Sequence, residues 1–159
     1  MLRIYTDGSC RKNGQGGWGY VVYDGDTIVK VAGAQVPNTT NNKMELTAII
    51  EALQAYGVQS DEWDMPIIYS DSIYALKSLG EWVSYWETHD WLNSQGKPVE
   101  NQDLIKKALW LLRHGHFARL EKIPGHLGIS GNEIADAIAT GDKQKLTKLL
   151  MNEKIISQG

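Results

Sequence analysis

The spacing of apolar residues predicts strands in the first part of the chain and helices later. Residues 2–7, 17–24 and 27–35 are rich in β-branched and aromatic side chains, and the Gly-Asp pair between the last two is a strong hairpin signal. From residue 41 to residue 56 the apolar positions recur with a helical period. The pattern therefore predicts three strands joined by hairpins and then a helix.

The rest of the chain alternates between the two periods. Residues 65–70 and about 116–123 have the composition of strands, residues 72–80 and 101–114 are patterned as helices, and a final helix begins near Ser130. Because helical crossovers make the strands that they join parallel, the two later strands should be parallel to the first. We therefore predict an α/β domain with a mixed sheet, three antiparallel strands followed by parallel ones, flanked by helices.

Two of the predicted strands end in the same short polar motif. The segment IYTDGSC places Asp7 after the first strand, and IIYSDS places Asp71 after the fourth. Turn formation explains either aspartate alone, since Asp, Gly and Ser favour tight reversals. However, the carboxyl ends of parallel strands meet at one edge of such a sheet, which is where ligands bind. We therefore expect Asp7 and Asp71 to lie close together.

A third carboxylate points toward the predicted core. On a helical wheel of residues 41–56, Glu45 falls near the middle of the apolar half, which includes Ile49, Ala52 and Leu53. The helix dipole favours a glutamate in the first turn, but this weak preference does not require an inward direction. Burying an ionised carboxylate is costly unless something compensates its charge, and a bound cation is the natural compensation.

A fourth acid, Asp136, lies in the final predicted helix. Ser130 and Glu133 have the spacing of a capping box, which explains both residues without any function. Asp136 follows among apolar residues such as Ala135 and Ile138, and taken alone it is most simply a surface aspartate. Together with the other three acids it completes a cluster whose mutual repulsion a cation would relieve.

The four acids are of the kind that holds divalent metal ions. No matching lysine or arginine, and no set of thiolates or histidines, accompanies Asp7, Glu45, Asp71 and Asp136 in the neighbouring sequence, and carboxylate oxygens suit Mg²⁺ or Mn²⁺. Two such ions about 4 Å apart can promote in-line attack on a phosphodiester, one by activating water and the other by stabilising the leaving oxygen. The residues alone therefore predict a nuclease or another phosphoryl-transfer enzyme.

Composition narrows the setting in which the protein works. The chain of 159 residues is long enough for one domain with its own core, and its single cysteine, Cys10, excludes an internal disulfide. It has neither the pattern of a signal peptide nor that of a membrane span, so we expect a cytoplasmic protein. We also expect it to be a monomer. A net charge of −3 argues against a protein that coats nucleic acid by bulk charge.

Four stretches, YTDGSC, TTNNKMEL, YSDS and GHLGISGNEIAD, resemble the ribonuclease H type 1 family in order and spacing. The resemblance runs from Leu2 to about Thr140 and implies a ribonuclease H-like fold with a five-stranded mixed sheet. It implies an endoribonuclease that hydrolyses the RNA strand of RNA–DNA hybrids with two metal ions, Mg²⁺ or Mn²⁺ as a substitute, leaving 5′-phosphate and 3′-hydroxyl ends. The catalytic metal ligands that it implies are Asp7, Glu45, Asp71 and Asp136.

His126 stands in the glycine-rich stretch PGHLGISG before the final helix. A loop histidine is most often simply exposed to solvent, although its near-neutral pKa suits proton transfer. The resemblance implies that His126 is catalytic, in proton transfer or in product departure.

The resemblance also implies which residues contact the hybrid. Short polar groups can sense 2′-hydroxyls across a shallow minor groove. The matching positions are Asn13, Asn41 and Asn42 against the sugar edges, Thr40 and Asn101 around a phosphate of the DNA strand, and Trp82 along the deoxyribose track. Turn formation and helix capping are alternative roles for the asparagines, and core packing is the alternative for Trp82.

One segment departs from the pattern of the family, and another lies beyond the resemblance. Residues 80–101 keep the tryptophans of a segment that is basic in many relatives, but here four acids accompany one lysine, so hybrid binding should be weak and salt-sensitive. Residues 141–159 follow the predicted ribonuclease H domain of residues 1–140 as a lysine-rich tail. We expect this tail to be helical and docked on the domain, with a contact to nucleic acid as the alternative.

Two other functions remain open from the sequence alone. The same sheet and acids serve DNA-cutting transposases, integrases and Holliday-junction resolvases, which would cleave a DNA duplex. A non-catalytic hybrid-binding module would normally lack one of the acids, and none is missing here. Cleavage of different duplexes would distinguish these functions.

Overall fold

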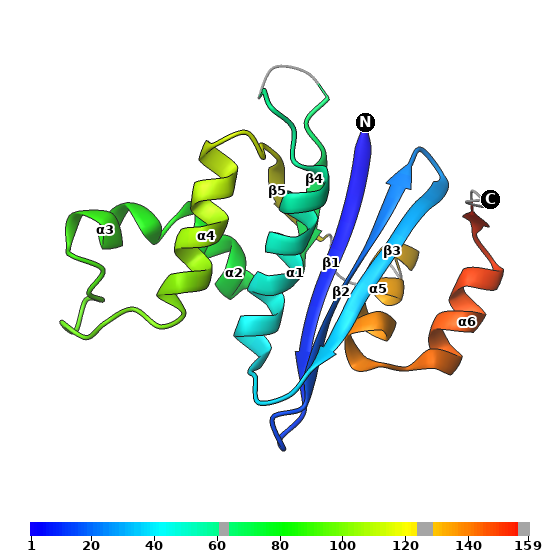
Figure 1. Ribbon diagram of the computed structural model, residues 1–159, viewed down its shortest axis with the longest axis horizontal. Coiled ribbons are helices and arrows are strands. Elements are labelled where there is room, and N and C mark those ends of the chain that lie inside the picture. The colour runs from blue at the N-terminus through cyan, green and yellow to red at the C-terminus, as the bar shows by residue number, and fades with distance from the viewer. Residues whose placement is uncertain (61–63, 124–128, 156–159) are drawn as a thin grey trace.

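The computed structural model describes residues 1–60, 64–123 and 129–155. Its strands are β1 (Leu2–Cys10), β2 (Gly16–Asp24), β3 (Thr27–Val36), β4 (Ile67–Ser70), β5 (Arg119–Lys122) and β6 (Lys154–Ile155). Its helices are α1 (Asn41–Tyr56), α2 (Ile73–Gly80), α3 (Val83–Thr88), α4 (Gln102–Arg113), α5 (Ser130–Thr140) and α6 (Lys143–Met151). Figure 1 shows that β1, β2 and β3 are the long central strands of the molecule.

The strands form one mixed sheet in the order β5-β4-β1-β2-β3-β6. β1 pairs antiparallel to β2 and β2 antiparallel to β3, whereas β4 runs parallel to β1 and β5 parallel to β4. These five strands confirm the predicted sheet, with the first strand at its centre. The sixth strand was not predicted: two residues of β6 pair parallel to β3 beside Thr27 and Ile28.

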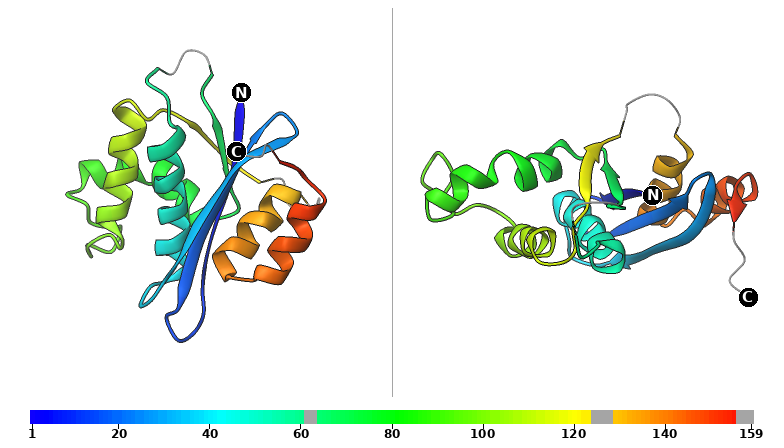
Figure 2. Two further views of the ribbon diagram at one scale, coloured as in Figure 1. Left: turned by 45° about the vertical axis from the view of Figure 1, so that its right-hand side comes forward. Right: turned by 90° about the horizontal axis from the view of Figure 1, so that it is seen from above.

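Alternate residues of the sheet face two separate cores. Ile4 belongs to a cluster with Leu46 of α1 and Ile105 of α4, whereas Tyr5 belongs to a cluster with Ile134 of α5. This follows from the two-residue period of a strand, which sends successive side chains to opposite faces. Both views of Figure 2 accordingly show α1 and α4 on one side of the sheet and α5 on the other.

The helices differ from the sequence expectations at two places. The N-cap of α5 is Ile129, without a side-chain cap, so Ser130 is already inside the helix and the predicted capping box does not form. Instead, the backbone N–H of Glu133 donates to the carbonyl oxygen of Ile129 at 3.2 Å. The short helix α3 was not predicted; its inward side chains, Val83 and Trp86, are three residues apart and become buried against the α1 and α4 cluster.

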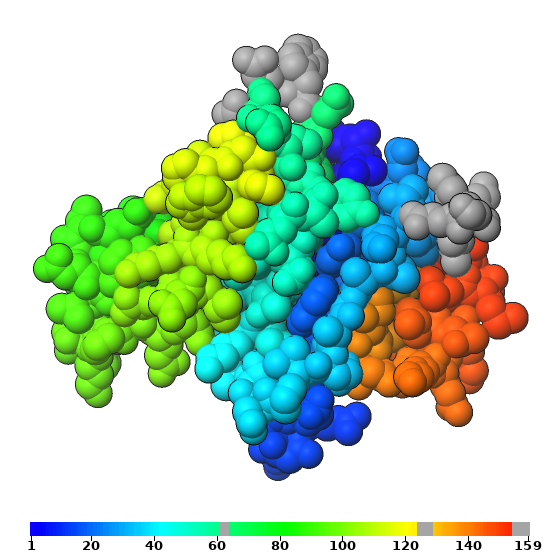
Figure 3. All heavy atoms as spheres, in the orientation of Figure 1, coloured from blue at the N-terminus to red at the C-terminus, as the bar shows by residue number. Residues whose placement is uncertain are grey.

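After α5 the chain turns back on itself. Gly141 ends α5 in the left-handed conformation with φ 73°, and the side chain of Asp142 then caps α6. Leu146 of α6 packs against the core cluster beneath α5, so α6 lies beside α5 (Figure 1). In Figure 3 the segment around α3 (green) and helix α6 (red) lie at opposite ends of the molecule. Among the described residues, no helix is both long and apolar enough to cross a membrane.

Candidate active site

The pairing of β1 with β4 brings the first two acids together. Ile4 lies beside Ile68 and Tyr5 beside Tyr69, and the same register two residues further places Asp7 beside Asp71. Asp71 directly follows β4, as predicted. Asp7 does not end its strand as predicted; it lies within β1, because the next three residues continue to pair with β2 after β4 has ended.

Glu45 reaches the two aspartates because α1 packs unusually close to β1. A Cβ atom on Gly8 would lie only 2.2 Å from the backbone nitrogen of Glu45, so this approach requires glycine. The N–H of Gly8 also donates to Oδ1 of Asp7 at 2.9 Å. As a result, one carboxylate oxygen from each of Asp7, Glu45 and Asp71 lies within 4.8 Å of the others.

Asp136 comes from the opposite face of the sheet. Gly19, the β2 partner of Asp7, lets α5 approach, since a Cβ atom there would lie 2.7 Å from Cβ of Ile138 and 2.9 Å from the carbonyl oxygen of Ala135. The charge of Asp136 acts on the carboxyl groups of Asp7 and Asp71. Asp136 thus borders the cluster, although the group of oxygens within 4.8 Å does not include it.

A lysine that is not a close sequence neighbour of the acids pairs with one of them in the structure. The Nζ atom of Lys145 lies 2.9 Å from Oδ2 of Asp136. Sequence reasoning missed this pair because nine residues and the Gly141 turn separate its members. Of the ion pairs in the described part of the chain, this is the one that involves a predicted metal ligand.

The other three acids are held in a site that disfavours their charged forms. Burial, followed by the charge of Asp71, raises the pKa of Asp7 well above its ordinary value. Burial, followed by the charges of Asp7 and Asp71, raises the pKa of Glu45 in the same direction. Desolvation also raises the pKa of Asp71, although the residue is exposed, and the charge of Asp136 adds to the rise. A bound cation would therefore stabilise the charged forms of these three carboxylates, which burial and mutual repulsion disfavour.

The site fits a divalent metal ion by two observations. Atom Oε2 of Glu45 is buried and has no hydrogen-bond partner among the described residues. Such an orphaned acceptor is costly unless an unseen partner satisfies it. The donors are all carboxylate oxygens, which hard ions such as Mg²⁺ and Mn²⁺ prefer.

Two of the predicted substrate residues serve the local backbone. The side chain of Asn13 accepts a hydrogen bond from the N–H of Gln15 at 2.9 Å, which shapes the turn between β1 and β2. Asn41 accepts from the N–H of Cys10 at 2.6 Å and so ties the start of α1 to the end of β1. Both residues are nevertheless exposed. Because they are exposed, a ligand can still reach them despite their roles in the turn and at the helix start.

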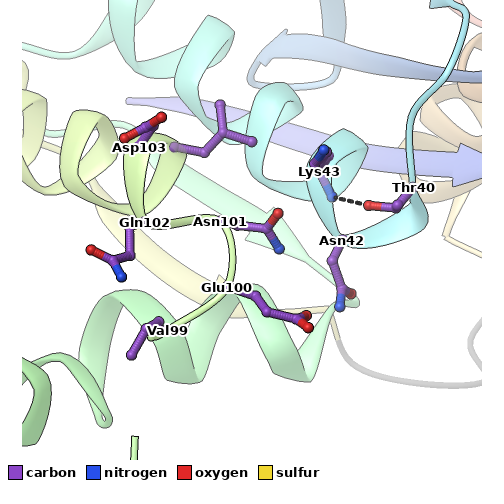
Figure 4. A pocket seen from close by; sticks show the side chains of 9 residues that line it. Thr40, Asn42, Lys43, Val99, Glu100, Asn101, Gln102 and Asp103 are labelled. Carbon is purple, nitrogen blue, oxygen red and sulfur yellow. Dashed lines mark hydrogen bonds between the residues drawn. The ribbon is translucent and has the colours of Figure 1, made fainter. Parts of the chain in front are cut away.

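Three other predicted substrate residues line one pocket. Thr40, Asn42 and Asn101 border a pocket of about 950 Å³ between the starts of α1 and α4. Thr40 also caps α1, its hydroxyl oxygen accepting from the N–H of Lys43 at 3.2 Å. In Figure 4 the side chains of Asn42, Glu100 and Asn101 point toward the same space. Lys43 and Glu100 also line this pocket, although no pattern in the sequence predicts that they do.

Trp82 packs in part against the core and remains half-exposed. Its ring centroid lies 6.3 Å from that of Tyr74 and 5.9 Å from that of Trp86. Nζ of Lys77 lies 5.8 Å from the Trp82 ring centroid, so a cation also contacts this aromatic group. Both the packing role and a surface role are compatible with this position.

The predicted catalytic residue His126 lies outside the described residues.

A family model and curated protein sequences both match this chain to the same family. Residues 1–144 match the family model described as RNase H. A ribonuclease H from Syntrophomonas wolfei subsp. wolfei is 43% identical over 138 residues, which are 86% of this chain and 91% of that protein.

Solved structures agree in fold. LC9-RNase H1, described as a type 1 RNase H with the type 2 active-site motif, is 30% identical with a TM-score of 0.70, covering 87% of this chain and 69% of that one. The foamy viral protease-reverse transcriptase, solved in complex with an RNA/DNA hybrid, shows the same fold with a TM-score of 0.75 at 21% identity, covering 92% of this chain and 20% of that one. The matches in sequence and in structure together show that this chain belongs to the RNase H family.

Proposed function

We propose that this ribonuclease H hydrolyses the RNA strand of RNA–DNA hybrids, leaving 5′-phosphate and 3′-hydroxyl ends. The observation that carries the proposal is the group of three carboxylates within 4.8 Å, in which one buried oxygen of Glu45 has no partner among the described residues. A protein that only bound hybrids would not need this unfavourable cluster. Curated relatives that carry the name ribonuclease H match along most of their length, which supports the same activity.

The family implies dependence on divalent metal ions, and the acidic cluster suits them. Our finer proposal is that two Mg²⁺ ions act, with Mn²⁺ as a substitute, and that Asp7, Glu45, Asp71 and Asp136 hold them. When bound, such ions supply an activated water and stabilise the leaving oxygen of the phosphodiester. The acids supply negative charge in fixed directions, since Gly8 holds the Asp7 carboxylate and α1 holds Glu45.

The polar residues around the cluster would place the substrate. We propose that Asn13, Asn41 and Asn42 contact the sugar edges and that the pocket with Thr40 and Asn101 takes a phosphate of the DNA strand. Asn101 donates to the hydroxyl of Tyr74 at 3.0 Å, which fixes its amide at the pocket. Trp82 would lie along the deoxyribose track. His126 would assist proton transfer or product departure.

We further propose that the enzyme acts as a monomer in the cytoplasm. The 1–140 domain and the 141–159 tail would work as one unit, because α6 packs against the α5 core cluster and β6 pairs with β3. Size-exclusion chromatography coupled to light scattering tests the monomeric state. A stable dimer would contradict it.

One cleavage experiment tests the proposed activity. End-labelled RNA–DNA hybrid, DNA duplex, RNA duplex and single-stranded RNA are incubated with the protein in Mg²⁺, Mn²⁺ or EDTA. Cleavage of the hybrid RNA strand alone, with either metal and not with EDTA, is the expected result. The isosteric variant Asp7→Asn should lose more than about 100-fold in rate, because it removes a proposed metal ligand. Cutting of the DNA duplex would indicate a DNA nuclease, and hybrid binding without cleavage would indicate a non-catalytic module.

A further inference from the structure

The proposed metal ligands differ in how their charge is balanced. Asp136 pairs with Lys145, whose Nζ lies 2.9 Å from Oδ2 of Asp136; the side chain of Lys145 is 39% exposed and that of Asp136 is 42% exposed. None of the ion pairs in the described residues involves Asp7, Glu45 or Asp71. One side of the cluster is therefore partly neutralised before any metal ion arrives, while the other side is not.

A turn closed by backbone hydrogen bonds places Lys145. The N–H of Gly141 donates to the carbonyl oxygen of Ile138 at 3.1 Å, and the N–H of Asp142 donates to that of Ala137 at 2.9 Å. Oδ1 of Asp142 then accepts from the backbone N–H of Lys145 at 3.0 Å. The backbone of Lys145 is thus fixed relative to α5, the helix that carries Asp136.

This arrangement predicts competition at one metal position. A divalent ion held by Asp7 and Asp136 must bind a carboxylate whose Oδ2 already contacts the Lys145 ammonium group, so the ion and the lysine repel each other and compete for the same negative charge. An ion held by Asp7, Glu45 and Asp71 meets no such rival in the described structure. The two ions should therefore bind with unequal affinity and in a fixed order.

Resting on the proposed two-metal function, we propose that Lys145 is a positioning residue. It holds the Asp136 carboxylate in place while the second metal position is empty and is displaced when an ion binds there. The lysine thereby raises the metal concentration at which the site is complete. Because the pair is partly exposed, the effect should be modest, about two- to fivefold in the affinity of the weaker ion.

Calorimetric titration of Mn²⁺ into the full chain, without nucleic acid, tests the proposal directly. The variants are Lys145→Met, which removes the charge, Lys145→Arg, which keeps it, and Lys148→Met as the matched control from the exposed side of the same helix. Lys145→Met should strengthen the weaker binding event by about two- to fivefold and leave the stronger one unchanged. Lys145→Arg and Lys148→Met should match the parent protein.

Each other result has a definite meaning. If the parent shows one binding event, Lys145→Met should reveal a second one at the same Mn²⁺ concentrations, and a single identical event in all variants would overturn the proposal. Weaker Mn²⁺ binding in Lys145→Met would overturn it as well. Hybrid binding in EDTA that falls in Lys145→Met but not in Lys148→Met, with unchanged Mn²⁺ affinity, would make Lys145 a phosphate contact instead.

The cleavage assay separates this inference from the proposed function. In Lys145→Met, the Mg²⁺ concentration for half-maximal hybrid cleavage should fall by about two- to fivefold. If Lys145→Met cleaves the hybrid with an unchanged Mg²⁺ dependence, the proposed role of Lys145 is refuted and the proposed function is not. If the parent protein does not cleave the hybrid but the calorimetric titrations give the expected Mn²⁺ affinities, the proposed function is refuted. The proposed role of Lys145 at the metal site would then still hold.

Discussion

The α-carbon of Gly8 faces the backbone nitrogen of Glu45 so closely that a Cβ atom would lie 2.2 Å from it. This contact sets the distance between β1, which carries Asp7, and α1, which carries Glu45. The glycine after the first aspartate is therefore part of the machinery that assembles the acids.

Gly8→Ala should damage both stability and activity. The added methyl group must push α1 away from β1, at a cost of about 1–3 kcal/mol. A shift of about 1 Å in Glu45 would lower the rate of hybrid cleavage by roughly 100-fold. Thermal melting and the cleavage assay measure the two effects. Gly80→Ala is the control, because a Cβ there meets no described atom within 4 Å; equal behaviour of the two variants would contradict the prediction.

The metal-free protein should lose stability as pH rises. Burial, with help from neighbouring carboxylates, raises the pKa of Asp7 to about 8 and that of Glu45 to about 9. The folded chain therefore keeps protons that the unfolded chain releases above about pH 4, and the lost stability accumulates between about pH 4 and pH 9.

Melting curves in EDTA should therefore show a lower melting temperature at about pH 8 than at pH 5, by more than about 2 °C for a chain of this size. Mg²⁺ should reverse the loss, because a cation stabilises the charged carboxylates. Asp7→Asn should flatten the pH dependence. A melting temperature that rises over this range in EDTA would refute the raised pKa values.

Glu100 should weaken hybrid binding at the pocket of Thr40 and Asn101. Its carboxylate points into the space where we place a phosphate (Figure 4). Glu100→Gln should tighten hybrid binding in EDTA by about two- to fivefold at low salt, and the gain should shrink as salt is added. Asp24→Asn, an exposed site at the β2–β3 hairpin, is the matched control. If both variants tighten hybrid binding equally, the effect comes from the net charge of the protein and not from the position of Glu100 at the pocket.

Removal of the chain after Gly141 should affect stability more than hybrid binding. Leu146, Leu149 and Leu150 of α6 pack against the core cluster beneath α5, so their loss exposes apolar surface. We expect a melting temperature lower by more than about 4 °C, which is about 1–2 kcal/mol for this chain length. Hybrid binding in EDTA should be unchanged. A weaker hybrid complex with an unchanged melting temperature would instead make the tail a nucleic-acid contact.

The convergence of the acids was predictable because it depends on local patterns. Asp7 lies within β1 and Asp71 directly follows the parallel strand β4, which pairs with β1 in register, and the helical wheel already turned Glu45 toward the sheet. The wrong capping box at Ser130 shows the limit of such patterns, since the N-cap of α5 is Ile129, whose side chain has no oxygen to accept a capping hydrogen bond.

The features that were missed depend on tertiary contacts. The Lys145 pair forms because the turn at Gly141 folds α6 back onto α5, and no periodicity within either helix records that direction. Likewise, β6 is two residues long and exists only through its pairing with β3. The pocket at Thr40 and Asn101 joins the starts of two helices that are some sixty residues apart in sequence.

The acidic segment of residues 80–101 bears on how the enzyme would search for its substrate. Most duplexes that a nuclease meets are ones that it cannot cut, and positive charge holds a protein on all of them alike. With four acids and one lysine, this flank would let the enzyme leave such duplexes quickly. Its turnover would then be limited by how often it encounters a hybrid, not by how long it stays trapped elsewhere.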